Sequence, residues 1–183
     1  MGKWATYSRR GRAPSAPVSQ IPPEVLLVEF APSVSAESSC NETRHALASC
    51  HQLPDNWTIT AASFRLRRAG AGSQDIFAGL WTGTDTDPVT NITLSPNRDL
   101  GGMSTVQTWQ RFELPSTPVA SGSFLWLALM APFSTAVFRP ILQNSSASHA
   151  PSKRIMAADV SLPWYLLSST YTLWYRLYGY VTP

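Results

Sequence analysis

Residues 57–68 read Trp57-Thr-Ile-Thr-Ala-Ala-Ser-Phe-Arg-Leu-Arg-Arg68, an alternation of apolar and polar side chains with a period of two. This period is typical of a β-strand that buries one face against a core. The apolar positions pass from odd to even numbers near Ala61 and Ala62. An extra residue in a strand produces such a change of phase, so the stretch predicts a strand with a β-bulge.

The rest of the chain repeats short runs of this kind between turns rich in Gly, Pro, Ser and Asn. Residues 124–130 are apolar at both parities, so we expect that strand to lie centrally in a sheet or under a neighbouring subunit. No amphipathic segment of helical length occurs, although Arg44–Cys50 could form one helical turn. About eight or nine strands predict an all-β fold, an antiparallel β-sandwich or jelly roll. The expected strands are Val25–Phe30, Trp57–Arg68, Asp75–Trp81, Val89–Leu94, Ser104–Leu114, Ser123–Met130, Ala136–Leu142, Arg154–Val160 and Tyr171–Val181.

The first 23 residues have a different composition from the rest, and we expect an extended basic, Pro-rich N-terminal arm over 1–23 and a β-sandwich domain over 24–183. Such a terminus is disordered in isolation and becomes ordered on a partner. Its aromatic and basic side chains are the first predicted partner-binding residues: Trp4, Tyr7, Arg9, Arg10 and Arg12.

Charge separates the arm from the body. Residues 1–12 hold four of the 14 basic residues and no acidic one, which leaves ten basic and eleven acidic residues, a net charge of −1, for residues 13–183. A nearly neutral body does not predict a nucleic-acid surface, so we expect no specific nucleic-acid partner. No apolar run approaches the 18 residues of a membrane span, and the N-terminus lacks the apolar region of a secretory signal. We therefore expect no membrane partner.

Two cysteines and two histidines lie close together in the sequence. A disulfide between Cys40 and Cys50 would close a short loop and add about 2–3 kcal/mol, whereas the lack of an export signal favours two thiols. Together with His45 and His51 they form a group of possible metal ligands. The spacing of this group matches no usual zinc pattern, because adjacent Cys50 and His51 cannot easily face one ion. We expect no metal and no cofactor.

Other polar motifs have simpler interpretations. Asn41, Asn56, Asn91 and Asn144 all begin N-x-S/T sequons, and we interpret them as polar residues of turns and strand edges. Asp85 and Asp87 could bind Ca²⁺, but two loop carboxylates more often form turns.

Catalytic patterns are missing. The three histidines, His45, His51 and His149, fall in expected loops, and no nucleophile elbow, P-loop, dinucleotide fingerprint or H-E-x-x-H motif occurs. We expect no catalytic residue and no enzyme activity.

The last expected strand has large side chains at both parities. Tyr171, Leu173, Tyr175 and Leu177 share one parity, and Thr172, Trp174, Arg176, Tyr178 and Tyr180 share the other. Trp and Tyr are favoured at protein interfaces and on sugar-binding platforms, although a thick sandwich could also bury both faces. We predict Trp174, Tyr178 and Tyr180 as further partner-binding residues.

Three segments resemble a known family. They are Phe64-Arg-Leu66 with the glycines 70 and 72 and Ile76-Phe-Ala-Gly-Leu-Trp81, then Trp109-Gln-Arg-Phe-Glu-Leu114, then Ser121-Gly-Ser-Phe-Leu-Trp-Leu-Ala-Leu129. Over roughly residues 57–131 they resemble a β-sandwich of tailed-bacteriophage virion proteins, in which a W-x-x-F-x-L-P strand precedes a G-x-[FY]-x-W-L-A-L strand. Arm residues 4–11 are similar to the starts of phage structural proteins.

The resemblance implies a structural virion protein. The first expectation is a capsid decoration (cement) protein, made in the host cytoplasm, that binds the major capsid protein on the capsid exterior and forms a homo-oligomer, most often a trimer. Surplus apolar surface at residues 124–130 and 171–181 favours self-association as well. The alternative is a carbohydrate- or receptor-binding β-module of a tail or fibre.

Overall fold

The computed structural model describes residues 22–31, 36–39, 46–70, 75–131, 139–146, 154–157, 165–168 and 171–183. These residues form fourteen strands and one short 3-10 helix, η1 (Leu100–Gly102). The strands are β1 (Val25–Phe30), β2 (Ala36–Ser39), β3 (Ala46–Gln52), β4 (Trp57–Ala69), β5 (Asp75–Gly83), β6 (Pro88–Leu94), β7 (Arg98–Asp99), β8 (Thr108–Val119), β9 (Phe124–Met130), β10 (Arg139–Ser146), β11 (Arg154–Ala157), β12 (Tyr165–Ser168), β13 (Tyr171–Leu173) and β14 (Tyr175–Val181).

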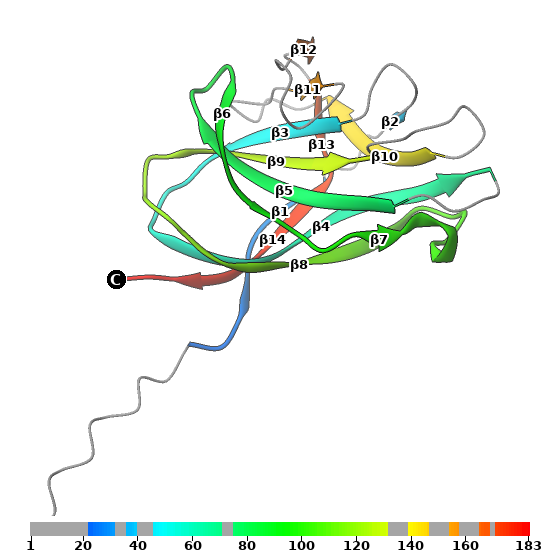
Figure 1. The fold of residues 1–183 in the computed structure, drawn as a ribbon. Coiled ribbons are helices and arrows are strands. Elements are labelled where there is room, and N and C mark those ends of the chain that lie inside the picture. Colours follow the sequence, from blue (N-terminus) through cyan, green and yellow to red (C-terminus); the bar gives the residue numbers. More distant parts are fainter. Residues whose placement is uncertain are drawn as a thin grey trace, which may run out of the picture.

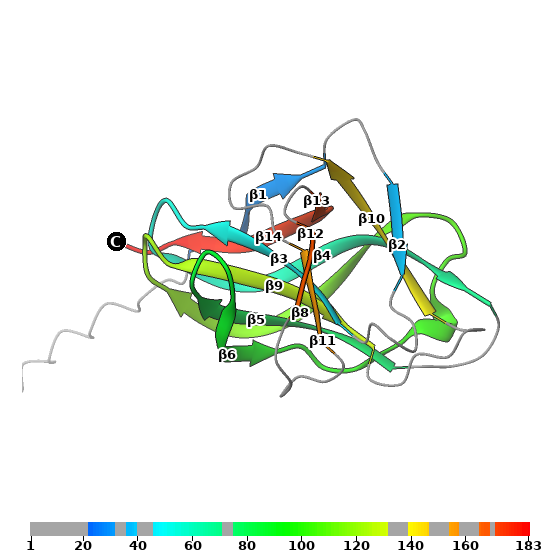
Figure 2. The ribbon, with the colours of Figure 1, turned by 90° about the horizontal axis from the view of Figure 1, so that it is seen from above.

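The strands form two antiparallel sheets, which confirms the expected all-β sandwich. Sheet I has the order β1-β14-β4-β10-β13, with β2 paired to β10 and β8 paired to β4. Sheet II has the order β12-β11-β3-β9-β5-β6, with β7 paired to β5. Figure 1 shows β3, β9 and β5 in one layer and β14, β4 and β8 in the other. In Figure 2 β1 lies beside β14, and β2 lies beside β10.

The core lies between the layers and follows the alternation of the sequence. Phe64 and Leu66 of β4 point into it, and so do the odd-numbered leucines of β9. The expected last strand, Tyr171–Val181, is divided at Trp174 into β13 and β14. These contribute Leu173, Tyr175 and Leu177, all at most 1% exposed, so one parity of this segment is core, as expected. Each fully buried Leu or Phe contributes about 1.5–3 kcal/mol.

The predicted bulge in β4 is present. The pairing of β4 with β8 shifts between Ile59 and Ala61, and the pairing with β14 shifts opposite it, between Tyr178 and Gly179. The backbones of β4 and β14 approach each other closely here. As a result, a Cβ atom added to Gly179 would lie 1.9 Å from the carbonyl oxygen of Thr58. The bulge therefore needs glycine at position 179.

β9 is central in sheet II and is covered on both faces. Its leucines face the main core, while Trp126, Ala128 and Met130 belong to a second buried cluster on the opposite face. Trp126 is fully buried, and its indole Nε1 donates to the carbonyl oxygen of Thr84 at 2.9 Å. The expectation of a central strand is confirmed, and the chain itself covers these side chains.

Some expected boundaries were wrong. The segment proposed as a helical turn within 44–50 is strand β3, because Ala46–Gln52 pairs with both β9 and β11. β8 continues to Val119, through a region where a turn was expected, because it follows β4 to Trp57. Strands β2, β7 and β12 were not expected at all; they are two to four residues long.

Candidate functional site

The outer face of sheet I is the surface turned away from the core on β1, β14, β4 and β8. Its central residues are small: Ala61 and Ser63 of β4 are buried. Arg176 of β14 and Arg111 of β8 both pair with Ser63, one on each side. The small central residues leave space that the long side chains of the flanking strands fill.

Guanidinium groups cross β4 through this space and cover aromatic rings. The guanidinium carbon of Arg176 lies 4.1 Å from the centre of the Trp109 ring on β8. In the opposite direction, the guanidinium carbon of Arg111 lies 4.5 Å from the centre of the Tyr178 ring on β14. Such contacts are worth about 0.5–1 kcal/mol at exposed sites and more when desolvated. The two contacts connect three strands across the sheet.

Carboxylates complete this network. Arg111 forms ion pairs with Glu24 at 2.7 Å and with Glu113 at 2.6 Å, and Arg176 lies 3.1 Å from Glu29 of β1. Hydrogen bonds to the two carboxylates, that of Glu113 first, raise the pKa of Arg111. The bond from Arg111 likewise lowers the pKa of Glu113.

A further ion pair connects the short strand β2 to the same face. Arg67 donates from Nε and Nη2 to the carboxylate of Glu37 at 3.0 and 2.8 Å, and Gln107 donates to the same carboxylate. The hydrogen bond from Arg67, followed by that from Gln107, lowers the pKa of Glu37 to about 2.

The root of the N-terminal arm is fixed on this face. Glu24, directly before β1, accepts hydrogen bonds from Arg111 of β8 and from the hydroxyl of Thr60 at the bulge of β4. Large apolar side chains are exposed beside it. Val25 and Leu26 are 50% and 47% exposed, and Val181 of β14 is 54% exposed.

Arg65 and Trp174 form a further contact on this face. The guanidinium carbon of Arg65 lies 5.0 Å from the centre of the Trp174 ring, and the backbone N–H of Arg65 donates to the carbonyl oxygen of Trp174. Within the described residues, Arg65 Nε and Trp174 Nε1 are buried donors without an acceptor. A buried donor left unsatisfied costs about 1–3 kcal/mol.

The predicted partner-binding residues differ in their burial and in whether the structure describes them. Trp174 is only 7% exposed, whereas Tyr178 and Tyr180 are half-buried on the outer face of sheet I. The arm residues lie outside the described part of the chain: Trp4, Tyr7, Arg9, Arg10 and Arg12. Sequence reasoning missed Arg65, Arg111 and Arg176. The signal was available, because Trp109-x-Arg111-x-Glu113 and Trp174-x-Arg176-x-Tyr178 alternate at one strand parity.

The expected cysteine–histidine set is only partly described, since Cys40 and His45 lie outside the described residues, as does His149. Cys50 is buried in the second cluster on the outer face of sheet II. His51 points the other way and lies 3.0 Å from the hydroxyl of Tyr175 through Nδ1. The two neighbours therefore face opposite sides of β3. Burial raises the pKa of Tyr175, so a neutral hydroxyl links the two sheets.

The other polar motifs form local structure where they are described. Asn56 accepts a hydrogen bond from the backbone N–H of Ser121, and Asn91 donates to the carbonyl oxygen of Leu80. Asn144 lies on β10, and Asn41 lies outside the described residues. The backbone N–H of Asp87 donates to the hydroxyl of Thr84 in a tight turn.

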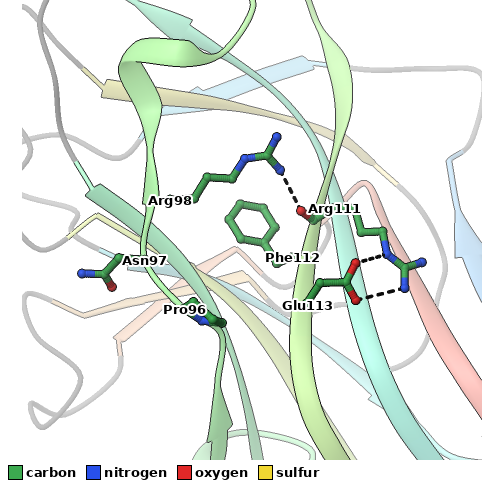
Figure 3. Close-up of a pocket in the computed structure, with 6 residues that line it drawn as sticks. All are labelled: Pro96, Asn97, Arg98, Arg111, Phe112 and Glu113. Carbon is green, nitrogen blue, oxygen red and sulfur yellow. Dashed lines mark hydrogen bonds and ion pairs between the residues drawn. The ribbon is translucent and has the colours of Figure 1, made fainter.

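A shallow cavity of about 280 Å³ lies at the edge of the sandwich and is shown in Figure 3. Arg98 lies over the ring of Phe112 at 5.8 Å and donates to the carbonyl oxygen of Arg111. Phe112 is 2% exposed, so its ring offers no platform for a ligand. The lining residues are Pro96, Asn97, Arg98, Arg111, Phe112 and Glu113.

The described residues contain no group of three or more His, Cys, Asp or Glu side chains placed to hold a metal ion. They also contain no helix of the length and apolarity that a membrane crossing requires. No protein-family model matches the chain, and a search of curated proteins finds no match.

Proposed function

We propose that this chain is a structural binding protein that docks on a larger protein assembly through its N-terminal arm and the outer face of sheet I. The observation that carries the proposal is the attachment of Glu24 to Arg111 and Thr60. Glu24 therefore gives the arm a fixed attachment point on the sheet, from which we expect its aromatic and basic side chains to reach the partner.

The surroundings of the arm root support this proposal. Leu26 pairs with Tyr178, so its exposed side chain lies on the same face as the predicted residues Tyr178 and Tyr180. Val25 and Val181 are also exposed, but they alternate with these residues and lie on the opposite face of the strand pair. Interfaces combine an apolar centre with aromatic and Arg side chains, and this end of sheet I has that composition.

The finer proposal is a decoration protein on the exterior of a tailed-phage capsid, bound to the major capsid protein. It rests on the resemblance of residues 57–131 to phage virion sandwiches. A homotrimer remains part of this proposal, also on the resemblance. The surplus apolar surface expected at residues 124–130 does not support it, because β9 is buried within the chain.

The alternative, a carbohydrate-binding tail module, has less support. Sugar platforms require an open ring face, and the rings of Trp109, Trp174 and Tyr178 each have a guanidinium group over one face. Copy number separates the two proposals. Hundreds of copies in a purified particle would support decoration, whereas a handful would support a tail location.

Deletion of residues 2–13 tests the role of the arm. The truncated protein should keep its melting temperature, because the sandwich core lies within residues 46–177, and it should lose binding to particles assembled without the protein. Trp4→Ala with Tyr7→Ala, compared with Arg9→Ala with Arg10→Ala, separates apolar from ionic anchoring. Full binding by the truncated protein would show that the arm is not the anchor.

A further inference from the structure

In the part of the chain that the structure describes, four arginines lie on the outer face of sheet I, and three of them have a carboxylate partner. Arg67 pairs with Glu37, Arg111 with Glu24 and Glu113, and Arg176 with Glu29. Among the described residues, Arg65 has no carboxylate partner. It is half-buried and lies on β4, two residues from Arg67 on the same face.

A second, independent feature occurs at the same place. Trp174 is 7% exposed, and its indole Nε1 is a buried donor that no described acceptor satisfies. The Nε atom of Arg65 is also a buried donor without a described acceptor. The guanidinium carbon of Arg65 lies 5.0 Å from the centre of the indole ring. Buried donors are normally satisfied by an acceptor. Within the described residues these two neighbouring donors have no acceptor, which leaves room for an acceptor supplied by a partner.

We propose that Arg65 and Trp174 form a binding point for one carboxylate, from an acidic side chain of the protein on which this chain docks. The inference rests on the proposed function and names the chemistry of the partner. A guanidinium group presents a planar fork of N–H donors that matches a carboxylate. Because Arg65 is half-buried, the carboxylate meets its guanidinium group, and the indole ring of Trp174, 5.0 Å from the guanidinium carbon, senses the bound anion.

Electrostatics favours a single carboxylate over a polyanion. Among the described residues, the outer face holds the glutamates 24, 29, 37 and 113 beside four arginines, so the charges described there sum to zero. A nucleic-acid backbone gains nothing from a neutral face, and it would be repelled by Glu37 next to Arg67. A single carboxylate can pair with Arg65, because the other three arginines are already paired with these glutamates.

The first test uses the isolated protein and two matched peptides. The probe is acetyl-Ala-Asp-Ala-amide, and the control is acetyl-Ala-Asn-Ala-amide at the same ionic strength. We expect the indole N–H resonance of Trp174, assigned with Trp174→Phe, to shift saturably with the Asp peptide only. Arg65→Gln should abolish the shift, whereas Arg67→Gln, on the same strand and face, should keep it.

Three outcomes would overturn the proposal. These are no saturable shift with the Asp peptide, an equal shift in Arg65→Gln, and a shift with inorganic phosphate but not with the peptide, which would indicate a free-anion site. The second test is particle binding, where Arg65→Gln should weaken affinity about tenfold and Arg67→Gln should not. If the wild-type protein does not bind particles, the proposed function fails, while the peptide titration still decides the carboxylate site.

Discussion

At the scale of single residues, small side chains determine where large ones can lie. Ala61 and Ser63 in the middle of β4 allow Arg111 and Arg176 to reach aromatic rings on the far side of the strand. In sheet II, Gly79 has the same role, because a Cβ atom there would lie 2.6 Å from the ring of Trp81. The composition predicted aromatic surfaces but not these contacts, since a contact across three strands depends on register.

Gly179, the glycine of β14, should tolerate substitution poorly. Gly179→Ala places a methyl group against the carbonyl oxygen of Thr58, so we expect the free energy of unfolding to fall by about 3 kcal/mol or more. Gly122→Ala is the control, because Gly122 has φ +76° but no atom within 4 Å of the added Cβ, and should cost about 1 kcal/mol. Chemical denaturation measures both, and equal costs would contradict the close approach.

The ion pair of Glu37 and Arg67 should make a small contribution to stability that depends on pH. The pKa of Glu37 is lowered from 4.5 to about 2, so the contribution is complete above pH 4.5 and is lost as the pH falls toward 2. Both side chains are substantially exposed, which limits the pair to about 0.5 kcal/mol. Denaturation of wild type and Glu37→Gln should differ by this amount at pH 7 and should converge near pH 2. A difference that persists at pH 2 would mean that charge is not its cause.

At the scale of strands, periodicity predicted some elements well and others poorly. β1, β4, β5, β6 and β9 lie close to their expected positions, because alternating or continuous apolar runs identify a strand directly. β3 escaped recognition, since Ala46, Ala48 and Cys50 are weak strand formers and only pairing with β9 and β11 holds them extended. The short strands β2 and β7 have no recognisable sequence pattern. They are extended because they pair with β10 and β5.

The outer face of β9 offers a test of whether the chain itself covers this strand. Ala128 pairs with Ala48 on one side and Gly79 on the other, a row of three small residues under a buried cluster of large side chains. Ala128→Leu should overfill this layer and lower the free energy of unfolding by about 1–3 kcal/mol. Val89→Leu, at a side chain 70% exposed, should have little effect.

The measurement is denaturation at several protein concentrations. If neighbouring subunits covered β9, the loss caused by Ala128→Leu would grow as the protein is diluted. A loss that is independent of concentration would confirm that the packing lies within one chain.

At the scale of the whole molecule, the fold places the root of the arm, at β1, beside the last strand, β14. β1 pairs with β14, so residues more than 140 positions apart in the sequence form one edge of sheet I. The sequence predicted the arm and the aromatic strand separately, because charge and composition reveal each of them. It could not predict that Glu24 connects them through Arg111, since no local pattern specifies which arginine a carboxylate meets.

Glu24 should therefore matter more for docking than for folding. Glu24→Ala removes an exposed ion pair, a loss of about 0.5 kcal/mol, but it also frees the arm root from β4 and β8. We expect faster hydrogen exchange at Val25 and Leu26 and about tenfold weaker particle binding. Glu29→Ala is the matched control, because it removes the ion pair with Arg176 at the other end of β1.

The control variant should lose a similar amount of stability and keep its particle affinity within about threefold. The reason is geometric: Glu24 fixes the point on the sheet at which the arm is attached, so less conformational freedom is lost at this point on binding. Release of Glu24 restores that freedom, whereas release of Glu29 leaves the root in place. Equal losses of affinity in the two variants would show that the general strength of β1, and not the position of the arm root, determines docking.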